Sequence, residues 1–381
     1  MANEQKLIYA CPWKKDKIKS WSGTYWNLRQ SLGRYYSVVD VDTGFSDNKR
    51  ILSLSYKVLK KVCQVSGSST LLPVKAQKAL IERRLEPAIR QAPYPMLQFE
   101  YMPSVENGRN QYLYIDLHYG YVKKMFEEEP GLFKVSGYSY LPKRLIDCNE
   151  YGQRMFMQEG TAVFTMGKWL KKELTQQYGI GQNNVFHAGG GINLDPGRID
   201  TSGKKRNKIL FVGRDFERKN GPLVVEAFKR LCRKRPDARL YIAGPKNLGL
   251  CGSNIYVLGD VPGDKLAEYF NLCDIFCMPS LFEAYGLVFA EALAFGLPCI
   301  GRNAFEMPYF IDEGNTGYLL RSQSAEELAG LMERLLGDEA VFANVKDNRE
   351  YYLNEYSWDN VAARIWRVIS HGTADAQGEQ Q

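Results

Sequence analysis

Cationic side chains follow the first strand predicted in the second half of the sequence. This strand spans Lys208–Val212, Gly213 and Arg214 come directly after it, and Lys219 lies five residues beyond the arginine. Residues at the carboxyl ends of parallel strands meet at one edge of a sheet, so both cations can point into a ligand site there. The planar guanidinium group of arginine matches the oxygen atoms of a diphosphate, and lysine adds a mobile point charge.

A second stretch, residues 274–295, has the order strand, polar turn and apolar helix. The first N–H groups of a helix lack acceptors within it and form the positive end of its dipole, so this helix start predicts an anion site. Gly286, just before the helix, lets a phosphate approach the backbone closely. Glu283 in the turn and Glu291, about one turn into the helix, offer acceptors for hydroxyl-rich groups on either side.

Together these residues resemble retaining glycosyltransferases of the GT-B fold, in particular the large family numbered 4. The family's marks are a Gly-Arg pair followed by a lysine, here Gly213, Arg214 and Lys219, and a pair of glutamates, here Glu283 and Glu291. The rest of the second half follows the family's order as well. The resemblance implies an α/β fold with two Rossmann-like, doubly wound domains that face a deep interdomain cleft.

The resemblance also implies a reaction. A sugar would move, with retention of configuration, from a nucleotide-diphosphate-sugar to a glycan, lipid-linked or small-molecule acceptor in polysaccharide or glycoconjugate assembly. Relatives need no divalent metal, so we expect no metal and no cofactor besides the donor substrate. Fixed positive charge near the departing phosphate lowers the barrier to its release. The family uses no protein nucleophile, so we assign no catalytic base.

Matching residues take roles from the family. Catalytic roles fall to Arg214, Lys219, Glu283 and His118. Donor-binding roles fall to Gly23, Gly213, Val261, Ala284, Tyr285, Gly286, Leu287, Val288 and Glu291. We expect Glu283 to bind the sugar hydroxyl groups, Glu291 the ribose, and the turn with Val261 the base. One departure is Asn220, which stands where many relatives have glycine.

Two loops of the first half match parts of the family's site. In relatives, a glycine-containing loop after the first strand faces the donor phosphates or the acceptor, and Gly23 occupies that place; a plain helix N-cap by Ser22 or Thr24 is the alternative. Relatives also carry a histidine that touches the donor sugar. His118 matches it, with Asp116 as second candidate, and a purely structural histidine is the alternative.

The length of 381 residues accommodates two domains of ordinary size. We expect an N-terminal acceptor-binding domain at 1–196 and a donor-binding domain at 205–354. A helix at 355–371 is expected to return to the first domain. The polar composition of 372–381 predicts a disordered tail.

Charge is divided unevenly along the chain. Residues 1–200 carry 28 Lys and Arg against 19 Asp and Glu, whereas residues 201–381 carry 22 against 24. The basic half predicts an anionic partner, which is either a nucleotide-sugar, an acidic glycan or an anionic membrane. The alternative is that these lysines are scattered and only solvate the surface. We expect no nucleic-acid partner. Predicted basic helices at 48–64 and 75–91 could contact the inner face of a membrane, or simply expose a solvated face.

The eight cysteines are dispersed without a Cys-x-x-Cys pair, which disfavours a zinc site and predicts free thiols in a reducing cytoplasm. No apolar run reaches transmembrane length, and the first residues lack the apolar region of a signal peptide. We therefore expect a cytoplasmic protein.

Two other functions stay open. An inactive nucleotide-sugar-binding subunit would lack donor hydrolysis, and intact Arg214, Lys219, Glu283 and Glu291 disfavour it. A sugar-nucleotide epimerase would isomerise the donor without transfer, and it would not be expected to show the pair of glutamates.

Overall fold

The computed structural model describes residues 5–44, 94–99, 110–158, 160–200, 207–246, 248–249, 252 and 254–375. The predicted helices at 48–64 and 75–91 lie outside the described residues. The chain divides into two compact units, which we name the N-terminal unit (residues 1–133, 138–189 and 358–381) and the C-terminal unit (residues 134–137 and 190–357).

The N-terminal unit contains a parallel sheet with the strand order β2-β1-β3-β4-β5-β6. Its strands are β1 (Lys6–Cys11), β2 (Ser37–Asp42), β3 (Met96–Gln98), β4 (Gln111–Ile115), β5 (Ala162–Thr165) and β6 (Val185–His187). The central strands are short, nearly continuous apolar runs, because a parallel sheet covered by helices is buried on both faces.

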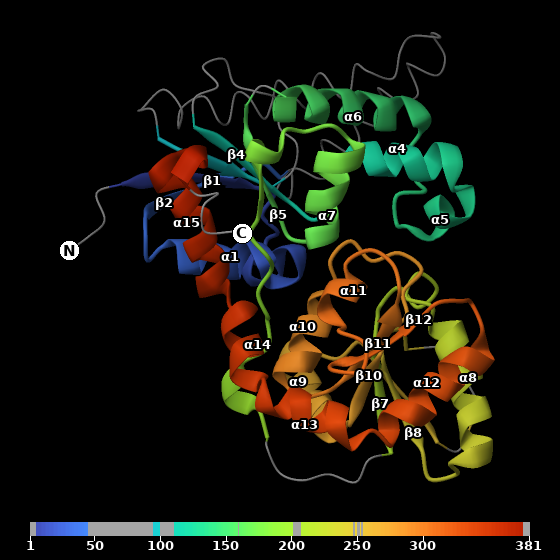
Figure 1. The fold of residues 1–381 in the computed structure, drawn as a ribbon. Coiled ribbons are helices and arrows are strands. Elements are labelled where there is room, and N and C mark those ends of the chain that lie inside the picture. The colour runs from blue at the N-terminus through green and yellow to red at the C-terminus, as the bar shows by residue number, and fades with distance from the viewer. Residues whose placement is uncertain are drawn as a thin grey trace. The chain divides into compact units, whose positions relative to one another are not determined.

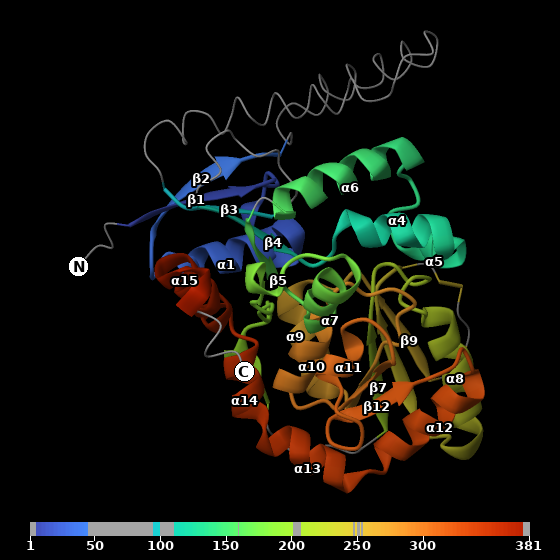
Figure 2. The same ribbon diagram turned by 45° about the horizontal axis from the view of Figure 1, so that its top comes forward.

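The described helices of this unit lie between its strands in the sequence, except for α15, which ends the described part of the chain (Figures 1 and 2). They are η1 (Lys17–Gly23), α1 (Thr24–Leu32), α4 (Tyr119–Glu128), α5 (Pro130–Val135), α6 (Lys143–Gln158), α7 (Lys168–Lys172), η3 (Glu173–Gln177), η4 (Gln182–Asn184) and α15 (Trp358–Asp375). The last helix packs on α1, where Ser31 Oγ donates to Asp359 Oδ1 at 2.8 Å. This helix is assigned to residue 375, with a non-helical residue at Gly372 (φ 81°), and residues 376–381 of the predicted tail lie outside the described residues.

The C-terminal unit contains a second parallel sheet with the order β12-β11-β10-β7-β8-β9. Its strands are β7 (Lys208–Val212), β8 (Arg239–Ala243), β9 (Ile255–Gly259), β10 (Ile275–Cys277), β11 (Cys299–Arg302) and β12 (Gly317–Leu320). The chain builds outward from β7 to β9, then returns to β10 beside β7 and builds in the other direction. The loops after β7 and β10 therefore meet where the strand order reverses, the usual place for ligands in such sheets.

Helices also cover this sheet (Figure 1). They are η5 (Pro196–Arg198), α8 (Gly221–Lys234), α9 (Gly263–Leu272), α10 (Leu287–Ala294), α11 (Met307–Phe310), α12 (Ala325–Leu336), α13 (Glu339–Asp347) and α14 (Arg349–Glu355). Phenylalanines from β7, β10 and α10 are fully buried at Phe211, Phe276 and Phe289, so the ends of these three elements are held on a packed core. Two doubly wound α/β sheets confirm the predicted fold class.

Candidate functional site

Two loops of the C-terminal unit, 213–220 after β7 and 278–286 after β10, are bonded to each other. The N–H group of Leu281 donates to the carbonyl oxygen of Arg218 at 2.8 Å. Asn220 Nδ2 donates to the carbonyl oxygen of Pro279 at 3.2 Å. Asn220 has φ 60°, a conformation that glycine adopts freely and asparagine tolerates better than most residues, which accounts for its place in the sequence.

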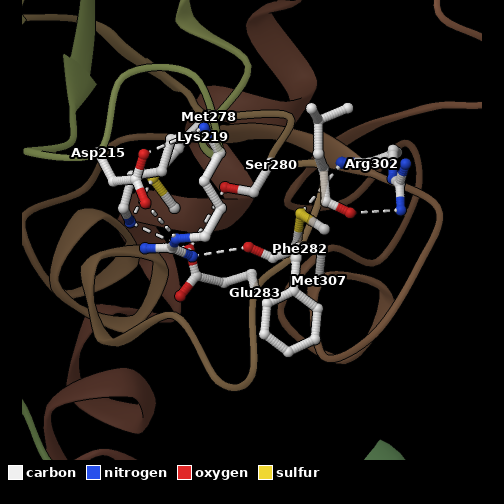
Figure 3. A network of polar contacts seen from close by, with 10 residues as sticks. Asp215, Lys219, Met278, Ser280, Phe282, Glu283, Arg302 and Met307 are labelled. Atoms are coloured by element: carbon white, nitrogen blue, oxygen red, sulfur yellow. Dashed lines mark hydrogen bonds and ion pairs between the residues drawn. The ribbon is translucent and has the colours of Figure 1, made fainter. Parts of the chain in front are cut away.

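Lys219 and Glu283 form an ion pair between these loops (Figure 3). Lys219 Nζ lies 3.0 Å from Glu283 Oε2, and the two side chains are only 13% and 11% exposed. Ser280 Oγ donates to the same carboxylate oxygen at 3.3 Å, and Met278 Sδ lies 3.1 Å from the ammonium nitrogen. The structure thus brings together two residues that lie far apart in the sequence.

Burial acts to raise the pKa of the Glu283 carboxyl, but the Lys219 and Arg218 cations outweigh it and hold that pKa below its usual value. Glu283 is therefore ionised at neutral pH, the form that accepts hydrogen bonds from hydroxyl groups. Burial lowers the pKa of Lys219, while attraction to Glu283 opposes that shift.

Gly213 makes room for Lys219. A Cβ atom at Gly213 would lie 2.3 Å from Lys219 Cδ, so a larger residue would displace the lysine stem. Gly244, after β8, is required for a similar reason, because a Cβ atom there would lie 2.1 Å from the carbonyl oxygen of Gly213. The role of Gly213 in this structure is thus to shape the loop around the lysine.

Arg214 points to a different partner. Its Nε donates to Asp260 Oδ1 at 2.8 Å, and the two side chains are 78% and 59% exposed. Asp260 precedes Val261, a half-buried residue in the loop between β9 and α9. Exposed ion pairs contribute about 0–1 kcal/mol, so Arg214 can exchange Asp260 for a more highly charged anion at little cost.

Arg218, which the sequence analysis did not select, lies against Glu283. Its Nη1 is 3.5 Å from Glu283 Oε2 and donates to the carbonyl oxygen of Phe282 at 2.7 Å. The available sequence signal was a third cation in the loop, directly before Lys219. No spacing rule distinguishes such a cation from a solvated one.

Gly286 precedes α10 with φ 98° and ψ 56°, in the left-handed region that favours glycine. A Cβ atom there would lie 3.0 Å from Phe289 Cδ2 and 3.1 Å from Glu283 Cγ. Leu287 and Val288 begin the helix and are half-buried, as is Ala284 in the turn. A helix start therefore lies beside the Glu283 side chain, as the strand-turn-helix pattern predicted.

Tyr285 and Glu291 bind the segment that enters the C-terminal unit. The Tyr285 hydroxyl accepts from the N–H of Gly190 at 3.0 Å and donates to its carbonyl oxygen at 3.2 Å. Glu291 Oε1 accepts from the N–H of Asn193 at 3.1 Å. Burial raises the pKa of Glu291 to about 7, although the N–H groups of Asn193 and Leu194 and the charge of Lys219 oppose this shift.

Gly23 in the N-terminal unit is the N-cap residue of α1. Gly23 and the two residues before it all have a left-handed backbone conformation, with positive φ. The φ angles are 42° at Trp21, 57° at Ser22 and 97° at Gly23. The N-cap residue is thus a glycine with a positive φ, which has no side chain to cap the helix itself. The Trp21 ring packs on the rings of Tyr25 and Tyr114 at 5.2 and 6.2 Å between centroids.

His118 is the N-cap residue of α4 and is only 1% exposed. Among the described residues, neither of its ring nitrogens has a hydrogen-bond partner, and its ring lies 4.5 Å from that of Tyr178. Burial, with smaller contributions from Arg154 and Lys124, lowers the pKa of His118 to about 3. The imidazole is therefore neutral at physiological pH. Asp116, the second candidate, follows β4 and is half-buried.

Comparison with known proteins points to one family. Residues 198–356, which include every element of the Lys219–Glu283 site, match the family model described as "Glycosyl transferases group 1". These findings support the glycosyltransferase group 1 family. The segment is hereafter the group 1 segment.

Curated relatives carry glycosyltransferase names. An uncharacterized glycosyltransferase of Methanocaldococcus jannaschii is 26% identical over 65% of this chain and 68% of its own. A D-inositol 3-phosphate glycosyltransferase of Corynebacterium aurimucosum is 25% identical over 52% of this chain and 54% of its own. A phosphatidyl-myo-inositol mannosyltransferase of Mycolicibacterium smegmatis is 25% identical over 45% and 46%. The chain spans about half the length of the latter two.

Solved structures show the GT-B fold. WaaG, a glycosyltransferase involved in lipopolysaccharide biosynthesis, matches 96% of this chain and 100% of its own with a TM-score of 0.64 and 16% identity. Sucrose-phosphate synthase from Thermosynechococcus elongatus matches 96% and 99% with a TM-score of 0.67 and 14% identity. The group 1 segment is thus one half of a GT-B fold. Along the described part of the chain, none of the helices has the length and apolar character needed to cross a bilayer.

Proposed function

We propose that the chain is a retaining glycosyltransferase of family 4 that moves a sugar from a nucleotide-diphosphate-sugar to a hydroxyl group of its acceptor. The observation that carries this proposal is the buried pair of Lys219 and Glu283, 3.0 Å apart beside the start of α10. A cation, an ionised acceptor and a helix start lie together there, and the donor offers a diphosphate next to a ring of hydroxyl groups.

The donor's diphosphate binds at Lys219 and at the first N–H groups of α10, where Gly286 allows close approach. Arg214 joins them by leaving Asp260, since that exposed pair is weak. Glu283 accepts hydrogen bonds from the sugar. Glu291 already accepts the N–H of Asn193, but a carboxylate has about four acceptor positions, which leaves room for the ribose hydroxyl groups.

The reaction breaks the bond between the sugar's anomeric carbon and the phosphate oxygen and forms a bond from that carbon to the acceptor oxygen. Negative charge develops on the departing phosphate, where Lys219 and the helix start stabilise it. The acceptor approaches on the same face and its proton passes to the phosphate oxygen, so the configuration is retained without a protein nucleophile. These fixed charges supply the stabilisation that a divalent metal gives in other transferases, and we propose that none is needed.

The acceptor is proposed to be an anionic, hydroxyl-rich molecule, either a glycan or a lipid-linked sugar or polyol. Relatives are named for inositol 3-phosphate and phosphatidyl-myo-inositol, both of which have this chemistry. The net positive charge of residues 1–200 would attract such acceptors. A lipid-linked acceptor would place the protein at the inner face of a membrane by peripheral contact.

The epimerase alternative has one supporting observation. A putative UDP-N-acetylglucosamine 2-epimerase from Listeria monocytogenes matches 96% of this chain with a TM-score of 0.55, at 15% identity, which is a likeness of fold alone. Product analysis separates the two functions, because an epimerase returns an isomerised donor whereas a transferase releases a nucleoside diphosphate.

A panel of UDP-glucose, UDP-N-acetylglucosamine and GDP-mannose tests the proposal. A donor that binds only the folded protein raises its melting temperature, and a transferase also releases UDP or GDP slowly by hydrolysis. We expect one sugar nucleotide to do both, and Lys219→Ala to abolish the shift. Thermal stabilisation without any nucleotide release, with acceptor sugars present, would indicate a binding subunit instead.

A further inference from the structure

The loop that carries Glu283 is held through its backbone carbonyl groups by side chains from other segments (Figure 3). Arg302 Nη2 donates to the carbonyl oxygen of Leu281 at 2.7 Å, and Arg218 Nη1 donates to that of Phe282 at 2.7 Å. The next residue is Glu283. The loop lies between β10 and α10, outside both elements, and the two arginines supply hydrogen-bond donors to its carbonyl groups.

Arg302 lies at the end of β11 and is held by its own surroundings. Its N–H donates to Met307 Sδ at 3.2 Å, and its guanidinium carbon lies 5.7 Å from the centre of the Phe305 ring. Phe305 has φ 56°, an unfavourable conformation for a bulky side chain, and its ring meets that of Phe282 edge-on at 5.1 Å. Backbone strain of this kind persists where the surrounding contacts enforce it, often beside functional groups.

Arg218 is fixed from the other side. Its Nε donates to Asp215 Oδ2 at 3.2 Å, and its backbone N–H donates to Asp215 Oδ1 at 3.3 Å. The planar guanidinium then reaches the Phe282 carbonyl and the Glu283 carboxylate with the same Nη1. A lysine could supply one of these bonds but not the fixed fork.

We infer that Arg218 and Arg302 are positioning residues that fix where the Glu283 carboxylate meets the donor sugar. The inference rests on the proposed function. Arg302 donates to the Leu281 carbonyl, two residues before Glu283, and acts through it, whereas Arg218 acts through both the loop and the carboxylate. Functional groups must be held to about 0.5 Å, and two donors on consecutive carbonyls supply that constraint.

Arg302→Gln is the principal test, in the full chain with the sugar nucleotide that raises the melting temperature. We expect kcat to fall about 100-fold, since a misplacement of about 1 Å has that effect, while the donor's Kd changes less than about 3-fold because Lys219 and the helix start are intact. Arg302→Lys restores one donor and is expected to recover part of kcat. Arg230→Gln, which breaks two exposed ion pairs, with Glu226 on α8 and Glu326 on α12, is the matched control and leaves kcat unchanged.

Combining Arg302→Gln with Glu283→Gln distinguishes positioning from general support of the fold. If Arg302 acts through Glu283, the second substitution adds no further loss of kcat to the first, whereas independent effects multiply. Multiplying losses, or an unchanged kcat in Arg302→Gln, would overturn the inference. If that variant does not fold, Arg218→Lys and Arg302→Lys carry the same test.

Hydrogen exchange separates this inference from the proposed function, because it needs no substrate. Arg302→Gln should increase the exchange rate of the amides of residues 281–283 at least 10-fold and leave the amides of α12 unchanged. Unchanged exchange in the loop would refute the positioning role even in an active enzyme. Faster exchange in a protein that binds no sugar nucleotide would support the role of Arg302 in holding the loop but refute the proposed function.

Discussion

Each unit has its own parallel sheet of six described strands, but the two units differ in how they hold their candidate functional groups. In the C-terminal unit, Lys219, Glu283 and Arg218 are ionic and bonded to one another across two loops. In the N-terminal unit, His118 is neutral and packed on Tyr178, and Gly23 lies in a loop beside aromatic rings. Similar sheets thus carry a cluster of paired charges in one unit and neutral, aromatic surroundings in the other.

In both units burial favours the neutral form of a titratable group, but it raises the pKa of the carboxyl and lowers the pKa of the histidines. Burial raises the pKa of Glu291 to about 7 in the C-terminal unit, so the folded state favours its neutral form. Burial lowers the pKa of His118 and of His187 to about 3 in the N-terminal unit, so the folded state again favours the neutral form. Raising the pH therefore lowers the stability contributed by Glu291, and lowering the pH lowers the stability contributed by the two histidines.

Removing the cation of the charged site should have the largest effect. Lys219→Ala takes away charge stabilisation of the departing phosphate, and we expect transfer to fall about 1000-fold. It also leaves Glu283 buried without its nearest cation, which should cost roughly 3 kcal/mol of unfolding free energy in urea. The double substitution Lys219→Met with Glu283→Gln should recover most of that stability but none of the activity. Recovery of neither would mean that the pair's contribution is not electrostatic.

Glu291 should make the protein less stable as the pH rises from about 4.5 to 7. Its folded-state pKa lies above its unfolded value, so the folded state binds more protons in this window and loses that advantage as pH increases. The full effect is about 3 kcal/mol and is complete above pH 7. Urea unfolding of the native protein and of Glu291→Gln should therefore differ by an amount that changes across this window by the Glu291 contribution. A difference between the two proteins that stays constant with pH would assign the effect to other groups.

His118 should give the opposite slope. The unfolded state binds a proton below pH 6.5 and the folded state only near pH 3, so stability falls as pH drops through this window. Between pH 6.5 and 5 the loss is about 2 kcal/mol. NMR titration of the His118 ring should show no protonation above pH 5, and His118→Gln should remove the His118 share of the slope and leave that of His187. A ring that titrates near pH 6.5 would remove the contrast between the units.

Arg214→Ala should have the smallest effect on stability, within about 1 kcal/mol, because its pair with Asp260 is exposed. Donor binding should weaken about 10-fold if the guanidinium moves to the diphosphate, as measured by titration calorimetry. Unchanged donor affinity would leave Lys219 as the only side-chain cation of the site that matters for binding.

Local patterns predicted the core of the charged site. The strand before Gly213, the turn at Glu283 and the helix after Gly286 follow from apolar runs and glycines, and parallel strand order brings the two loops together. The spacing placed Gly213 and Lys219 in one loop, but the close packing of the lysine stem on Gly213 was seen only in the structure.

Non-local contacts account for what the sequence could not predict. Arg302 donates to a backbone carbonyl 21 residues away, and Arg218 donates to one 64 residues away. Neither bond could be predicted, because every residue has a backbone carbonyl and the sequence does not mark which one accepts. Asp260 as the partner of Arg214 depends on how β9 lies in the sheet. The partners of Tyr285 and Glu291 depend on the path of residues 190–194, which composition marks only as glycine-rich.

A crystal structure of the protein with the sugar nucleotide that most raises its melting temperature tests the central claim most directly. We predict diphosphate oxygens within about 3 Å of Lys219 Nζ and of the first N–H groups of α10, with a sugar hydroxyl on Glu283. A diphosphate bound elsewhere, with the Lys219–Glu283 pair unchanged, would contradict the account.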